Sequence, residues 1–134
     1  MAKLLLVDDS KTFIKVLRRI LENKYTIIGQ AHDGGEGIER YKELSPDLVL
    51  LDITMPNVNG KDCLRGILSL NPSAKVIMVS SLDDQQTVSE CLSLGAVAFI
   101  AKESITLQEL NAPGPLLHAV ESAVGADYPG LEAL

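Results

Sequence analysis

Acidic, hydroxyl and basic side chains stand directly after four of five short apolar runs in this 134-residue sequence. Asp8 and Asp9 follow the first run, Asp52 the third, Ser80 the fourth and Lys102 the fifth. Three carboxylates that lie close together repel one another, so a cation is needed to keep all of them ionised. Oxygen ligands without His or Cys favour Mg²⁺ or Mn²⁺ over Zn²⁺.

Such a set of side chains fits the transfer of a phosphoryl group, whose charge needs a metal ion and a further cation such as Lys102. A carboxylate such as Asp52 can itself attack phosphorus and form an acyl phosphate. Asp9 or the following Ser10 is also suited to cap a helix, because both residue types are favoured at that position.

The apolar runs indicate strands, and the segments between them show helical spacing. The expected strands are Lys3–Val7, Thr26–Ala31, Leu48–Leu51, Lys75–Val79 and Val97–Ala101. Helix faces are expected at Phe13, Val16, Leu17, Ile20 and Leu21, over Gly37–Leu44, at Leu64, Ile67 and Leu68, at Val88, Cys91, Leu92 and Leu94 before Gly95, and over Leu116–Val124. This alternation predicts an α/β fold, a doubly wound five-stranded parallel sheet with five helices. Right-handed crossovers bring the carboxyl ends of all strands to one edge, where ligands bind in such sheets.

The composition predicts one domain over residues 1–124 and a frayed tail over residues 125–134. Apolar residues make up 46% and charged residues 22%, and the formal net charge of −6 disfavours direct binding to nucleic acid. Cys63 and Cys91 have no metal-ligand spacing and are expected to be buried free thiols. The first apolar run is too short for a signal peptide or a membrane span, so we expect a cytoplasmic protein that does not contact membranes.

Four motifs together resemble the receiver domains of two-component response regulators, the CheY-like family, over residues 3–124. They are LLLVDDS (residues 4–10), DLVLLDITMPNVNG (47–60), VIMVSS (76–81) and GAVAFIAK (95–102). The resemblance, and not the periodicity, implies the strand order 2-1-3-4-5 of flavodoxin-like receivers.

The resemblance also implies a role for each site residue. Asp52 matches the phospho-acceptor, while Asp8 and Asp9 match the acidic pair that binds Mg²⁺ together with Asp52 and the backbone carbonyl of Thr54. Lys102 matches the lysine that contacts the phosphoryl oxygens. Ser80 matches the switch hydroxyl and Phe99 the switch aromatic. Gly60 matches a residue of the loop after the acceptor, where it is expected to help a tight turn.

A receiver takes its phosphoryl group from a sensor histidine kinase or a phosphotransfer protein. By resemblance it then changes a protein-binding surface made by the fourth helix, the fifth strand and the fifth helix, for example in chemotaxis or a phosphorelay. Such a protein catalyses its own phosphorylation and dephosphorylation, and is a signalling switch rather than a turnover enzyme. The downstream target is not indicated by the sequence.

The sequence departs from the family pattern after the lysine. Glu103 stands where the family usually has Pro, so a trans bond is expected, because a cis bond before a non-proline residue costs about 2.5–4 kcal/mol. In LNAPGPLLHAV (residues 110–120), Pro113-Gly114-Pro115 should delay the last helix. We therefore expect a short helical turn near Leu107–Leu110, then a loop, then the helix.

Three alternatives remain open from the sequence. A Mg²⁺-dependent phosphatase would also use three acids, but Asp52 is followed by Ile53-Thr54 and lacks the Asp-x-Asp signature of the haloacid-dehalogenase type. A receiver-like module could bind partners without phosphorylation. A flavodoxin-like flavin binder is disfavoured, because aromatic residues make up only 4% of the chain.

Overall fold

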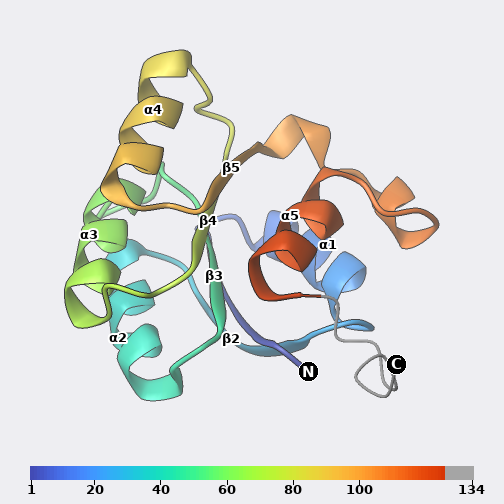
Figure 1. Cartoon of the computed structure of the whole chain (residues 1–134), viewed down its shortest axis with the longest axis horizontal. Helices are drawn as coiled ribbons and strands as arrows, with labels where there is room; N and C mark the ends of the chain where they lie inside the picture. Colours follow the sequence, from blue (N-terminus) through green and yellow to red (C-terminus); the bar gives the residue numbers. More distant parts are fainter. Residues whose placement is uncertain (126–134) are drawn as a thin grey trace.

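Five strands and five α-helices alternate along residues 1–125, the part of the chain that the computed structural model describes (Figure 1). The strands are β1 (Lys3–Val7), β2 (Thr26–Ala31), β3 (Leu48–Leu51), β4 (Val76–Ser80) and β5 (Ala98–Ala101). The α-helices are α1 (Lys11–Leu21), α2 (Gly34–Leu44), α3 (Gly60–Leu70), α4 (Gln85–Leu94) and α5 (Pro115–Val124). Two short 3-10 helices, η1 (Lys102–Ser104) and η2 (Leu107–Leu110), lie between β5 and α5. Most of the predicted tail, residues 126–134, lies outside the described residues.

The strands form one parallel sheet in the order β2-β1-β3-β4-β5, which confirms the predicted fold class. Helices α1 and α5 cover one face of the sheet, and α2, α3 and α4 cover the other (Figure 1). Each face has its own apolar core, because successive side chains of a strand point to opposite faces. In β1, Leu4 and Leu6 join the core beneath α1 and α5, whereas Leu5 and Val7 join the core beneath the other three helices.

Local capping bonds set where the helices begin. The side chains of Ser10, Asp33, Asn59 and Asp84 each accept a backbone N–H from the first turn of the helix that follows. Ser10 caps α1, so the helix starts two residues after the acidic pair and leaves both carboxylates in the preceding loop.

Several predicted boundaries and faces are corrected. Helix α2 begins at Gly34 rather than Gly37, strand β4 begins at Val76 and ends at Ser80, and β5 begins at Ala98. In α4, Leu92 is 44% exposed, and the residues buried beneath this helix are Thr87 and Cys91. Helical spacing assigned Leu92 to the core because it treats every apolar residue alike, although an exposed leucine is common on protein surfaces.

The segment after β5 takes the predicted course. A 3-10 turn forms at Leu107–Leu110, and α5 begins at Pro115 after the Pro-Gly-Pro sequence. No peptide bond within the described residues is cis, so the Lys102–Glu103 bond is trans as expected. None of the helices found between residues 1 and 125 has the length and apolar character needed to cross a membrane.

Candidate functional site

Three carboxylates meet at the carboxyl ends of neighbouring strands. Asp8 and Asp9 follow β1, and Asp52 follows β3, which pairs directly with β1. One oxygen from each carboxylate lies within 4.8 Å of the other two. Asp8 and Asp52 are buried, with 2% and 4% of their surface exposed, while Asp9 lies at the exposed mouth of the cluster. The predicted convergence of the acidic residues is therefore confirmed.

Backbone hydrogen bonds continue the sheet past the strand ends and hold two of the acids in place. The N–H of Asp8 donates to the Ala31 carbonyl at 3.0 Å, and the N–H of Asp52 donates to the Val7 carbonyl at 2.9 Å. Each side chain uses its Oδ1 locally: Asp8 accepts from the N–H of Ser10, and Asp52 accepts from the N–H of Ile53, both at 2.8 Å. The Oδ2 atoms thus remain for other partners.

Lys102, the first residue after β5, joins the two buried acids. Its Nζ lies 2.9 Å from Asp8 Oδ2 and 3.3 Å from Asp52 Oδ2, and the lysine side chain is 16% exposed. Burial opposes the charged lysine, but the hydrogen bond to Asp8 and the charges of Asp8 and Asp52 outweigh it and raise the pKa of Lys102. The ammonium therefore stays charged at neutral pH.

The environment of Asp8 disfavours its ionised form. Burial raises its pKa above 3.8, and the charge of Asp52 raises it further, although hydrogen bonds from Lys102 and Ser10 act in the opposite direction. With all groups ionised, three carboxylates and one ammonium give a formal charge of −2, which one divalent cation would balance. The donors are all oxygen atoms, which suit Mg²⁺ or Mn²⁺, so the residues present fit such an ion.

The two predicted switch residues lie on β4 and β5. Ser80 ends β4, is 1% exposed and pairs across the sheet with Ala101, the residue before Lys102. Its hydroxyl accepts the N–H of Leu82 at 3.2 Å. Phe99 is half-buried and packs against the core beneath α2, α3 and α4. Ser80 thus lies at the end of its strand, on the edge of the sheet that carries the acids, and Phe99 lies in the strand that leads to Lys102. The switching roles of both residues stay predictions.

The loop from Asp52 to α3 is held by a close backbone approach. The N–H of Gly60 donates to the Ile53 carbonyl at 2.7 Å, and a Cβ on Gly60 would lie only 2.1 Å from the carbonyl oxygen of Asp52. Gly60 is therefore needed for the close backbone approach in this turn, and its own φ is not positive. The positive φ in this loop, 64°, belongs to Asn57. Thr54 is exposed in the same loop, and its carbonyl as a metal ligand stays a prediction.

Phe13 is a site residue that sequence reasoning missed. Lys102 Nζ lies over its ring, 4.7 Å from the centroid. Helical spacing had assigned Phe13 to the core face of α1, and the ring does pack against that core. The sequence signal that could have identified Phe13 as a site residue is its place in the first turn of the helix that follows the acidic pair.

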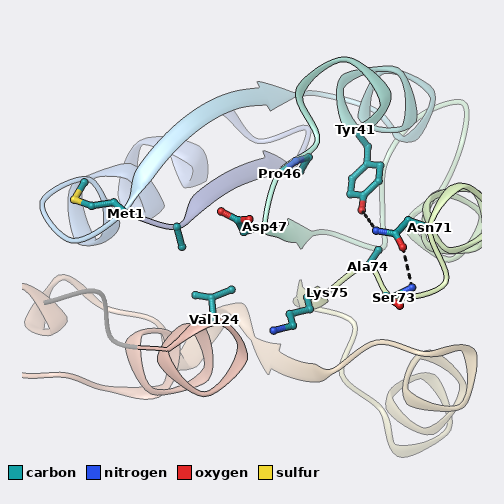
Figure 2. Close-up of a pocket in the computed structure, with 10 residues that line it drawn as sticks. Met1, Tyr41, Pro46, Asp47, Asn71, Ser73, Ala74, Lys75 and Val124 are labelled. Carbon is teal, nitrogen blue, oxygen red and sulfur yellow. Dashed lines mark hydrogen bonds between the residues drawn. The ribbon is translucent and has the colours of Figure 1, made fainter. Parts of the chain in front are cut away.

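A cavity of about 520 Å³ lies at the opposite end of the sheet, near the amino ends of the strands (Figure 2). Its wall includes Tyr41, Asn71 and Lys75, and the Asn71 amide donates to the Tyr41 hydroxyl. The carboxylate of Asp47, also in the wall, accepts the N–H of Lys3 at 2.7 Å. Among the described residues of its wall, Asp47 is the single acid, so on this part of the chain the cavity lacks the clustered carboxylates of Asp8, Asp9 and Asp52.

Comparisons with known proteins agree on one family. The sequence profile described as "Response regulator receiver domain" matches residues 4–112. The chain is 48% identical over 103 residues to "Protein CcdB" of Bacillus subtilis, covering 76% of this chain and 86% of the relative. It is 39% identical over 104 residues to the chemotaxis protein CheY of Thermotoga maritima, covering 76% and 87%. A chain of the CheX–CheY–BeF3–Mg complex from Borrelia burgdorferi has a TM-score of 0.81 and 38% identity, covering 90% and 87%.

Proposed function

The chain belongs to the response regulator receiver domain family of two-component signalling, and we propose that Asp52 is its phospho-acceptor. The observation that carries this proposal is the buried Asp52 carboxylate, which shares one lysine with Asp8 and lies within ligand distance of two further acids. A structural site would not gather three like charges at one edge of a sheet, because the arrangement stores repulsion.

The transfer uses Asp52 as nucleophile. A carboxylate oxygen of Asp52 forms a bond to phosphorus while the bond from phosphorus to the donor nitrogen of a phosphohistidine breaks. The electron pair of that bond leaves with the imidazole, which departs as neutral histidine when the other ring nitrogen of the phosphohistidine carries a proton. Lys102, already 3.3 Å from Asp52, is placed to contact a phosphoryl oxygen and to stabilise the charge that gathers there.

We assign the metal ligands to Asp8, Asp9, Asp52 and the carbonyl of Thr54. When Mg²⁺ or Mn²⁺ is bound, it supplies positive charge against the carboxylates and the phosphoryl oxygens. The fit of a divalent ion is supported by the oxygen-only donors and by the formal charge of −2. Asp9, exposed at the mouth, leaves a side of the cluster open to solvent and to a donor.

The proposed change in the output surface depends on interactions that Ser80 and Lys102 make only after phosphorylation. A phosphoryl group adds about −1.5 to −2 charges and strong acceptor oxygens. The Ser80 hydroxyl and the Lys102 ammonium then gain partners that the free protein lacks. Movement of Ser80 toward the phosphoryl group leaves room into which Phe99 can turn, and a differential interaction of a few kcal/mol is enough to shift the equilibrium.

The proposed output surface is made by α4, β5 and α5. Apolar residues are exposed on or beside these elements: Leu92 on α4 is 44% exposed and Val97, just before β5, is 49% exposed. A downstream protein would bind this surface in one state of the switch. The phosphodonor is a sensor histidine kinase or a phosphotransfer protein, and the pathway is chemotaxis or a phosphorelay in the cytoplasm.

Incubation with acetyl phosphate and Mg²⁺, followed by intact-protein mass spectrometry, tests the acceptor. We expect the mass of one phosphoryl group on the wild-type chain and none on Asp52→Asn. A mass gain that survives Asp52→Asn would overturn the assignment of the acceptor. Continuous release of phosphate from simple phosphate monoesters would instead support a phosphatase.

A further inference from the structure

Lys102 has a third neighbour besides its two carboxylates. Its Nζ lies 4.7 Å from the centre of the Phe13 ring, over the ring face, in a site where only 16% of the lysine side chain is exposed. We propose that Phe13 is a positioning residue, whose ring holds the Lys102 ammonium above Asp52 in the geometry that phosphoryl transfer needs. The proposal rests on the proposed function and adds a residue outside the predicted site.

Four contacts form a closed circuit around the ammonium. The Asp8 carboxylate accepts the N–H of Ser10, and the Ser10 hydroxyl accepts the N–H of Phe13 at 3.2 Å. The ring of Phe13 faces Lys102, and Lys102 returns to the other oxygen of Asp8 at 2.9 Å. The capping bond of α1 therefore fixes the backbone of Phe13 relative to the same carboxylate that binds the lysine.

An aromatic ring suits this position better than a fourth polar group. The negative face of the ring attracts the ammonium, but the ring has no net charge and accepts no proton. Phe13 can therefore fix Lys102 without neutralising the charge that Lys102 must offer to a phosphoryl oxygen. The interaction strengthens as water is removed, which matches the low exposure of the lysine.

Packing alone is the competing explanation, because Phe13 also contacts the core beneath α1 and α5. Leucine would replace most of this packing but has no π face, whereas tyrosine keeps the face. Phe13→Leu and Phe13→Tyr thus separate the two explanations. Ile14→Val is the matched control, since Ile14 is the next residue of α1 and is buried in the same core, 2% exposed.

The rate constant of Asp52 phosphorylation by acetyl phosphate with Mg²⁺ is the first measurement, because this small donor involves no protein docking. We expect Phe13→Leu to slow the reaction about three- to tenfold, and Phe13→Tyr to stay within about twofold of wild type. Ile14→Val should keep the wild-type rate constant although it lowers the melting temperature. Equal rates for Phe13→Leu and wild type, or equal slowing by Leu and Tyr, would overturn the proposal.

The second measurement does not depend on phosphorylation. Protons over an aromatic face move upfield in NMR spectra, so the ε-methylene protons of Lys102 should be shifted upfield in wild type and Phe13→Tyr. The shift should disappear in Phe13→Leu, and its absence from wild type would contradict the contact itself. A wild-type chain that shows this shift but gains no phosphoryl mass would instead contradict the proposed function.

Discussion

At the residue scale, burial disfavours the charged form of Asp8. Burial is the main reason that its pKa is raised, and the charge of Asp52 acts in the same direction, so ionising this carboxyl costs the folded protein free energy. The cost is fully present above the folded pKa, declines as pH falls below it, and is gone below the ordinary value of 3.8, where the unfolded chain is protonated as well. Function, rather than stability, explains why an acid stands at this position.

We therefore expect Asp8→Asn to stabilise the folded protein by about 1 kcal/mol at pH 7 without divalent ions. The amide can still accept the Ser10 N–H, and Lys102 keeps its contact with Asp52. Thermal unfolding followed by circular dichroism measures the effect, with exposed Asp83→Asn as a control that should change little. Mg²⁺ should then raise the melting temperature of wild type more than that of Asp8→Asn, since ligand binding stabilises only a state that binds it. Destabilisation by Asp8→Asn would contradict the strain assigned to this carboxyl.

The two cysteines give a second prediction at this scale. Cys63 and Cys91 are fully buried and free. Burial, with a smaller contribution from Asp33, raises the pKa of Cys63 from 9.0 to about 12, and burial also raises the pKa of Cys91. Since the thiolate is the reactive form, native protein should resist iodoacetamide at pH 8 and should not gain reactivity between pH 7 and pH 9. Mass spectrometry should find both thiols modified only after denaturation, and rapid labelling of the native protein would contradict their burial.

At the scale of elements, the apolar strands were predictable because burial on both faces leaves a continuous apolar run. β1, β2 and β3 have the predicted bounds. The start of α2 was not predictable from helix propensity, since glycines are poor helix formers. The Asp33 cap sets the start of this helix. The N–H of Gly34 also bonds the Val58 carbonyl at 3.1 Å, and a Cβ would lie 2.3 Å from that oxygen, so contact with a distant loop explains why a glycine stands at the first helical position.

The start of α5 depends on a carboxylate from η2. Gly114 precedes the helix and has no side chain to cap it. Glu109 is instead buried, 5% exposed, and accepts the N–H groups of Gly114, Leu116 and Leu117 at 2.9–3.1 Å. The predicted turn at Leu107–Leu110 is confirmed. The sequence did not reveal that Glu109 in this turn is buried, because the amide N–H groups that need its carboxylate lie five to eight residues further along the chain.

Glu109→Gln should destabilise the fold by about 2 kcal/mol, the scale of buried hydrogen bonds to a charged group. The amide has the same shape but presents a donor NH₂ to backbone donors, and it has no charge to interact with the helix N-terminus. Urea unfolding measures the loss, and exposed Gln108→Ala in the same turn is the control. Equal stability of the Glu109→Gln variant and wild type would show that α5 does not need this cap.

At the scale of the whole molecule, the acids and the lysine were predictable because parallel strands bring their carboxyl ends to one edge. Asp8, Asp52 and Lys102 are far apart in sequence yet lie within hydrogen-bonding distance around one ammonium. The strand order came from the resemblance, since no periodicity orders strands. Phe13 was missed because helical spacing already explained it as a core residue, and only the fold places Lys102 over its ring.

The central sheet also links the site to the proposed output surface, since Ser80 and Lys102 stand at the ends of adjacent strands β4 and β5. Phosphorylation should give both residues new partners and so reduce local opening in the segments that carry them. We expect hydrogen exchange to slow in residues 80–87 and 98–104 after acetyl phosphate and Mg²⁺ are added, while α2 stays unchanged. Asp52→Asn, treated in the same way, is the control and should show no slowing beyond the effect of Mg²⁺ alone. Slowing that is equal in all elements would indicate general stabilisation by phosphorylation and would contradict a switch directed to α4, β5 and α5.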